Sequence, residues 1–117
     1  SYQVLKQYYE AEEKKKEQEK IKRVAENKIP EFEAYTGDSL RLTREVLGIE
    51  LEEVANSSGI AIGHLRNIET EQYAFLPPKA YVKAFIRKYA EFLSLDPVKV
   101  SADYIRRMEK QLTGDSE

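Results

Sequence analysis

The first part of the chain lacks the recurring apolar positions that mark a buried helix face. Between Glu10 and Lys20 the only apolar residue is Ala11. Helix-forming residues are frequent there, as are opposite charges four residues apart, such as Glu10 with Lys14. Apolar residues occur only near the two ends, at Tyr2, Val4, Leu5, Tyr8 and Tyr9, and at Ile21, Val24, Ala25 and Ile29. The pattern predicts one helix from Tyr2 to about Asn27, either a solvated spacer, a helix that pairs with a second copy or another domain, or a frayed segment.

The pattern changes at Pro30, which disfavours helical backbone in the residue before it. The segment Gly37–Ser39 then provides a break and a new helix N-cap. We therefore expect a charged helical spacer and linker over residues 1–36, a main domain over residues 37–112 and a disordered tail over residues 113–117.

Apolar positions at helical spacing recur throughout the main domain, and no strand-like alternation of useful length appears. They predict five short helices, at about Ser39–Leu47, Leu51–Ser57, Ile62–Glu69, Pro78–Leu93 and Pro97–Leu112. Gly59 lies between the second and third helices, where it can adopt positive φ in a tight turn. The predicted fold class is all-α, with five helices around one small core behind a long charged helix.

Composition narrows the class of protein further. The chain has 117 residues, 34% of them charged and 41% hydrophobic, and a formal net charge of −2. It has no cysteine and no run of the roughly 20 apolar residues needed to cross a bilayer. These features predict a cytoplasmic domain without membrane contact in this part of the protein, and the overall charge gives no reason to expect nucleic acid.

The sequence offers no constellation typical of an enzyme. His64 is the only histidine, and the chain has no phosphate-binding glycine loop or cluster with metal-ligand spacing. A paired acid and base would need a walled pocket to separate their pKa values, and no segment provides one. We therefore expect a non-enzymatic binding module with no cofactor, metal or small-molecule substrate.

The stretch EEVANSSGIAIGHLRNIE, from Glu52 to Glu69, has helix-turn-helix spacing. Ala55 is small where two helices would cross, Gly59 makes the turn, and Ile60, Leu65 and Ile68 would fill the core. The stretch resembles the helix-turn-helix family of the phage repressors, the Xre type. A longer part of the chain looks most like the helical domains of bacterial RodZ-like cell-shape proteins, over about Gly37 to Arg107. The residues that carry this resemblance are LRLTREVLGIELEEVANSSGIAIGHLRNIE followed by FLPPKAYVKAFIRKYAEFLSLDPVKV.

The resemblance implies two different partners. Repressor-like relatives bind DNA with the third helix, whereas RodZ-like relatives contact an actin-like filament with the helical domain. RodZ-like chains also continue into a membrane span, so such a span could follow in a longer protein. The long charged helix before the domain is not part of the usual RodZ-like arrangement. Its first residues, SYQVL, are similar to the end of the last helix of a chaperone J-domain.

For DNA binding, the third helix would present residues near its N-terminus to the major groove. Asn67 could pair with adenine, and Arg66 with guanine or phosphate. Carboxylates at Glu50, Glu52 and Glu53 oppose this role because they repel a phosphate backbone. The full set of candidate DNA-binding residues is Arg41, Arg44, Ile62, Gly63, His64, Arg66 and Asn67.

For protein binding, the fourth helix is the better candidate because it combines aromatic residues with a basic ridge. Tyrosine contributes apolar area and a hydroxyl at little entropic cost. The candidate protein-binding residues are Tyr81, Lys83, Phe85, Arg87 and Tyr89. The alternatives are that these aromatics belong to the core and that the basic ridge is a solvated face.

Overall fold

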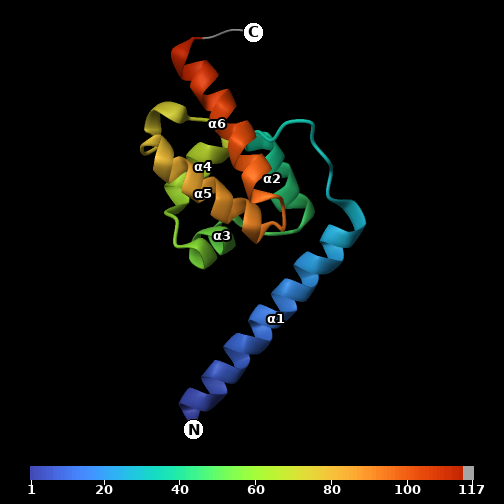
Figure 1. The fold of residues 1–117 in the computed structure, drawn as a ribbon. Coiled ribbons are helices and arrows are strands. Elements are labelled where there is room, and N and C mark those ends of the chain that lie inside the picture. The colour runs from blue at the N-terminus through green and yellow to red at the C-terminus, as the bar shows by residue number, and fades with distance from the viewer. Residues whose placement is uncertain (115–117) are drawn as a thin grey trace.

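The computed structural model describes the backbone of residues 1–114 and the side chains of residues 1–19 and 29–114. Over that part the protein is helical, with no strand. The elements in chain order are α1 (Tyr2–Lys28), α2 (Gly37–Val46), α3 (Leu51–Ser58), α4 (Ile62–Glu69), a short 3₁₀ helix η1 (Tyr73–Phe75), α5 (Lys79–Phe92) and α6 (Pro97–Thr113) (Figure 1). The all-α class and the five helices of the main domain are confirmed.

The long helix α1 extends away from the bundle formed by α2 to α6 (Figure 1). It has 27 residues and begins with Ser1, whose hydroxyl accepts a hydrogen bond from the Val4 amide. The expected pair Glu10–Lys14 does not form an ion pair among the described residues. Exposed pairs of this kind contribute little to stability, so the helix does not depend on them.

The core of the bundle lies where α5 packs against α3 and α6. Tyr89 of α5 and Tyr104 of α6 are the largest fully buried side chains. Both tyrosines lie on the apolar face of their helix, because apolar residues three and four positions apart fall on the same side of a helix. The other buried apolar residues are Leu40, Leu47, Ile49, Val54, Ile60, Leu65, Ile68, Val82, Ile86, Ala90, Leu93, Val100, Ile105 and Met108.

Helix α2 begins two residues earlier than the sequence indicated. Thr36, rather than a residue of the Gly37–Ser39 segment, is the N-cap: its Oγ1 accepts from the Ser39 amide at 3.2 Å, and Ser39 Oγ accepts from the Thr36 amide at 3.0 Å. This reciprocal capping box satisfies two backbone donors at the helix start. Gly37 is thereby placed inside α2, and its backbone is buried against the end of α4.

The segment before α2 is attached to α6 through Asp103. The Asp103 carboxylate accepts from the Tyr35 amide at 3.1 Å and pairs with Lys99 at 3.3 Å and Arg106 at 2.9 Å. Burial alone would raise the pKa of Asp103, but the hydrogen bond from Tyr35 and the two cations outweigh it and lower that pKa. The segment expected to be only a linker therefore contacts the bundle directly.

The chain end differs slightly from expectation. Thr113, expected in a disordered tail, is the last residue of α6, and Gly114 closes the helix at a φ of 71°. The remainder of the expected tail, residues 115–117, lies outside the described residues. None of the helices described is both long enough and apolar enough to cross a membrane.

Candidate functional site

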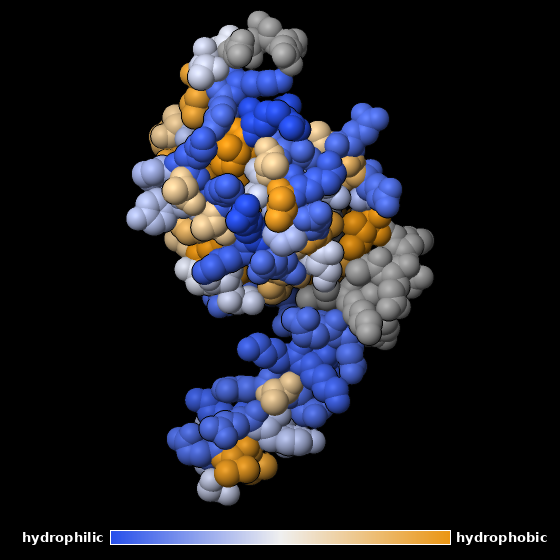
Figure 2. Space-filling model, in the orientation of Figure 1, coloured by the Kyte–Doolittle hydropathy of each residue, from blue (hydrophilic) through white to orange (hydrophobic). Residues whose placement is uncertain are grey.

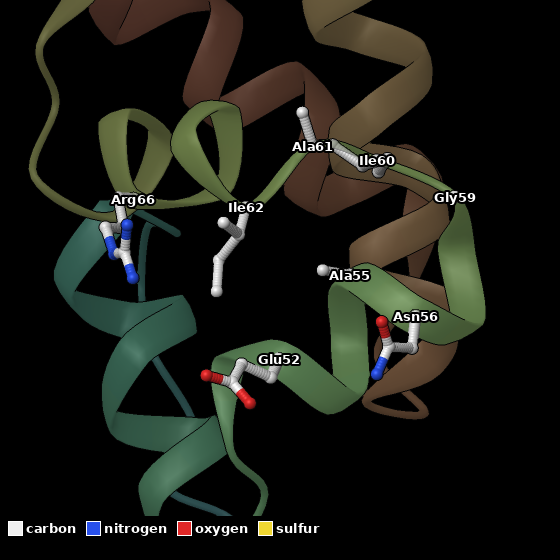
Figure 3. A pocket seen from close by; sticks show the side chains of 8 residues that line it. All are labelled: Glu52, Ala55, Asn56, Gly59, Ile60, Ala61, Ile62 and Arg66. Carbon is white, nitrogen blue, oxygen red and sulfur yellow. The ribbon is translucent and has the colours of Figure 1, made fainter.

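Two surfaces contain the candidate residues, and the first is the helix-turn-helix face. Gly59 ends α3 with a φ of 75°, a left-handed conformation that lets the chain reverse into α4. The turn leaves an open groove of about 680 Å³ between α3 and α4 (Figure 3). The groove is lined by Glu52, Ala55, Asn56, Gly59, Ile60, Ala61, Ile62 and Arg66.

The groove carries one charge of each sign. Glu52 projects from the first turn of α3, and Arg66 from α4 (Figure 3). The Ile62 side chain points into the space between α4 and α3. Because the acidic side chain lies in the groove itself, the site lacks the uniformly basic lining that phosphate binding favours.

Arg44 is not available as a DNA contact. Its Nε and Nη2 atoms donate to the two carboxylate oxygens of Glu69 at 2.9 and 3.0 Å, and its Nη1 donates to the Ile49 carbonyl at 2.9 Å. The side chains of Arg44 and Glu69 are only 12% and 5% exposed. The hydrogen bonds with Glu69 raise the pKa of Arg44, so the charge is fixed within the fold.

Tyr89 belongs to the same network, and its placement corrects the expected protein-binding surface. Its ring is fully buried, and its hydroxyl donates to Glu69. Burial, followed by the Glu69 charge, raises the pKa of Tyr89. Tyr89 is therefore a core residue that joins α5 to α4, and a partner cannot contact it in the folded protein.

The other DNA-binding candidates are placed unevenly. Arg41 is half-buried and bonded to Glu45 at 3.0 Å and to Asp38 at 3.4 Å, which offsets its charge. Gly63 is exposed, whereas Ile62 and Asn67 are half-buried. Arg66 is exposed and, unlike Arg41 and Arg44, forms no ion pair within the described part of the chain.

The second surface is the solvent side of α5. At about 100° per residue, Tyr81 and Phe85 lie within about 40° of each other around the helix, whereas Arg87 lies about 120° away from Tyr81. Lys83 lies further round, so the predicted residues do not form one face. Arg87 is turned towards α6, where its Nε donates to Ser101 Oγ at 3.3 Å.

We define the α5 aromatic edge as Tyr81, Phe85 and Lys88 of α5 together with His64 of α4. Tyr81 is 60% exposed, and Phe85 is half-buried. The His64 ring stacks on Phe85 with centroids 5.7 Å apart and planes inclined at 30°. Lys88 is exposed and has no ion-pair partner in the part of the chain that the structure describes.

The comparisons with known proteins agree with this geometry. A family model described as a helix-turn-helix domain matches residues 39–100, more than half of the chain. The chain belongs to this helix-turn-helix domain family. The match runs from the first turn of α2 into α6, so the helix-turn-helix domain includes α5 as well as the α3–α4 motif.

One curated relative supports the RodZ-like form of the helix-turn-helix domain. It is the cytoskeleton protein RodZ of Streptococcus pneumoniae (strain ATCC BAA-255 / R6), 33% identical over 60 residues. The aligned part is 51% of this chain and 22% of the relative, so the chain spans about a fifth of that protein's length. No solved structure matches the chain.

Sequence reasoning did not identify the polar contacts that hold the helix-turn-helix domain together. Beside the Arg44–Glu69–Tyr89 network, Glu71 accepts from Tyr73 at 2.6 Å, from Arg107 at 2.9 Å and from the Gly37 amide at 3.1 Å. The positive φ of 56° at Glu71 marks this turn, but no sequence motif indicates it. Within the described residues, no group of three acidic or histidine side chains is arranged to hold a metal ion.

Proposed function

We propose that this chain is a protein-binding helix-turn-helix module that uses the α5 aromatic edge, and that its partner is an acidic surface such as that of an actin-like cytoskeletal filament. The observation that carries the proposal is the exposure of Tyr81 beside the stacked pair of Phe85 and His64. The cytoskeletal assignment rests on the name of the RodZ relative, which is a cytoskeleton protein.

The aromatic edge has the features of an interface anchor. Tyr81 exposes most of its ring on a rigid helix, and its i+4 neighbour Phe85 is held in place by His64. A partner can therefore bury aromatic area without first ordering a loop, which lowers the entropic cost of binding. The buried Tyr89 supports this edge by fixing α5 to α4.

The charge of α5 supports an acidic partner. Lys83, Arg87 and Lys88 are exposed on this helix, against one exposed carboxylate, Glu91. Lys79 at the helix start is bonded to Glu109, so it adds less to the field. The net positive charge of α5 speeds encounter with an oppositely charged surface. Only Lys88 lies on the α5 aromatic edge itself, where it can contact the bound partner.

DNA binding through α4 remains the second candidate, and the observation that favours it is the exposed Arg66 at the groove. It is the weaker candidate because Arg44 is buried in an ion pair and Arg41 is bonded to two carboxylates. Glu52 in the groove opposes a polyanion. In the proposed arrangement residues 37–112 form the binding domain and residues 1–36 the spacer that positions it.

The proposal is tested by co-sedimentation of the full chain with a purified actin-like filament. We expect Tyr81→Ala combined with Lys88→Ala to weaken binding at least about 10-fold, which is about 1.4 kcal/mol. Lys83→Ala with Arg87→Ala is the matched control on the other edge of α5, and it should change the affinity much less. Thermal melting of both variants should stay close to that of the parent chain, because the four side chains are exposed.

A parallel titration with random duplex DNA at low and moderate salt separates the second candidate. DNA binding by α4 requires an affinity that falls steeply with salt and is lost in Arg66→Ala with Asn67→Ala. Salt-sensitive DNA binding combined with unchanged filament binding in the Tyr81→Ala, Lys88→Ala variant would overturn the proposal.

A further inference from the structure

The first turns of α1 carry apolar side chains that no described part of the bundle covers. Tyr2, Leu5 and Tyr9 are 76%, 55% and 63% exposed, and their spacing of three and four residues places them on one face. Figure 2 shows an apolar spot near the N-terminal end of α1, bordered by hydrophilic side chains along the helix. We define the α1 tip face as these three residues and the charged residues that line a shallow groove of about 360 Å³ with them, Lys6, Glu10 and Glu13.

The groove between α3 and α4 has the chemistry to accept such a face. Ala55 and Ala61 contribute only methyl groups to its lining, so another helix can approach closely. The Ile62 side chain points into the space between α4 and α3 and offers apolar area to that helix (Figure 3). Leu5 and Tyr9 can therefore be buried against apolar atoms of the groove, which removes their exposed surface from water.

The charges of the two surfaces are complementary. The α1 tip face carries one cation, Lys6, and two carboxylates that follow it by one and two helical turns. The groove carries one carboxylate, Glu52, and one cation, Arg66 (Figure 3). None of these charged side chains forms an ion pair within the described part of the chain. Lys6 can therefore pair with Glu52, and Arg66 can pair with a carboxylate of the α1 tip face.

We infer that the α1 tip face of one copy binds in the α3–α4 groove of a second copy. The contact involves residues 2–13 of one copy and residues 52–66 of the other. Within one molecule the two surfaces do not meet, because α1 extends away from the bundle (Figure 1). Two copies that exchange their helices in this way fill both grooves, and the assembly closes as a dimer.

The exchange covers the side of α4 that DNA binding would need and leaves the α5 aromatic edge free. Ile62 and Arg66 lie on the covered side of α4, four residues apart. His64, which belongs to the α5 aromatic edge, lies about 160° around the helix from each of them, at about 100° per residue. Dimerisation therefore does not depend on what α5 binds, and co-sedimentation of a monomeric variant with a filament reports on the proposed function alone.

Sedimentation equilibrium of the full chain over a dilution series tests the association. We expect a reversible monomer–dimer equilibrium whose dissociation constant rises at least about 10-fold in Leu5→Ser with Tyr9→Ser, because the apolar contact is lost. Leu112→Ser is the matched control, because Leu112 is 60% exposed at the other end of the protein and should leave the equilibrium unchanged. A parent chain that is monomeric at every concentration would overturn the inference.

Charge reversal tests whether the groove is the binding site. Lys6→Glu should raise the dissociation constant at least about 10-fold, because it places a second carboxylate beside Glu52. Lys6→Glu combined with Glu52→Lys should return the dissociation constant to within about threefold of that of the parent chain. Lys15→Glu is the matched control, because Lys15 lies on the opposite side of α1. A double variant that is folded by circular dichroism and still fails to dimerise would show that Lys6 does not contact the groove.

Single cysteines test the contact directly, and the chain permits them because it has none of its own. Gln3→Cys lies beside the α1 tip face, and Asn56→Cys lies in the lining of the groove. A mixture of these two variants should form a mixed cross-linked dimer with a short bismaleimide. Gln3→Cys mixed with Ala102→Cys, at an exposed position of α6, should not. Cross-linking of Gln3→Cys to itself but not to Asn56→Cys would place α1 against α1 and overturn the inference.

Discussion

Gly37 lies where the start of α2 meets the end of α4, and no side chain fits between the two backbones. A Cβ atom at this position would lie 2.6 Å from the Ile68 carbonyl oxygen and closer still to that of Glu69. Both neighbours are backbone atoms, so they cannot rotate away as a flexible side chain could. The close approach also lets the Gly37 amide donate to the Glu71 carboxylate at 3.1 Å.

We expect Gly37→Ala to lower the free energy of unfolding by about 2–3 kcal/mol, because α2 must move away from α4 to relieve the overlap. Gly63→Ala is the matched control: Gly63 is also in a helix, and a Cβ there meets nothing within 4 Å. That variant should gain about 0.5–1 kcal/mol from better helix propensity. Denaturant unfolding of both variants checks the pair, and equal effects at the two positions would contradict the packing argument.

The buried positions of Arg44 and Tyr89 could not be predicted from the local sequence pattern. In sequence, each looks suited to a surface, because each ends in a polar group beside other polar residues. Their partner, Glu69, is 25 residues from Arg44 and 20 from Tyr89, so the contacts exist only after α2, α4 and α5 have packed. Polar groups that are buried because they form hydrogen bonds with one another can therefore be identified only in the assembled fold.

The helices of the bundle, α2 to α6, could be predicted because each carries an apolar face and a stop signal, whereas α1 was predicted from its helix-forming residues and its charge pairs. The turn at Gly59 and the Gly114 end of α6 are examples of such local signals. The start of α2 was misplaced because both Thr36 and Ser39 are good capping residues, and the pattern does not say which one caps. The helix η1 was missed because its three residues are too few to show a period.

A substitution at Asp103 should release the segment before α2 from α6, because the Asp103 carboxylate accepts the hydrogen bond from the Tyr35 amide. We expect Asp103→Ala to increase hydrogen exchange at the Tyr35 amide at least about 10-fold, because its acceptor is removed. The bundle should lose only about 1–2 kcal/mol, since the carboxylate contacts lie at its edge. Asp38→Ala is the control, because its 74% exposed side chain holds only an exposed pair with Arg41. Unchanged exchange at Tyr35 would contradict this account of the attachment.

Three tyrosine hydroxyls from three different elements form hydrogen bonds with residues at and just after the end of α4. Tyr89 of α5 donates to Glu69, Tyr73 of η1 donates to Glu71, and Tyr104 of α6 donates to the Ile68 carbonyl at 2.7 Å. Burial is the main cause that raises the pKa of each hydroxyl, and nearby carboxylates add to it. The fold therefore depends on tyrosines that keep their protons.

These tyrosines make the free energy of unfolding depend on pH under alkaline conditions. A tyrosine in the unfolded chain loses its proton near pH 10, whereas Tyr89 and Tyr104 keep theirs in the folded protein to higher pH. Their stabilising contribution is therefore fully present below about pH 10 and decreases as the pH rises further. Above about pH 10, each of these two tyrosines lowers the free energy of unfolding by about 1.4 kcal/mol per pH unit.

We expect denaturant unfolding measured between about pH 8 and pH 11.5 to show a plateau followed by a steep decline in unfolding free energy. Tyr104→Phe should cost about 1 kcal/mol on the plateau, because the Ile68 carbonyl loses its donor, and should make the decline shallower by about 1.4 kcal/mol per pH unit. Tyr81→Phe changes an exposed phenol, so its curve should superpose on that of the parent chain. An equal slope in the Tyr104→Phe variant and the parent chain would mean that the Tyr104 hydroxyl is not held protonated by the fold.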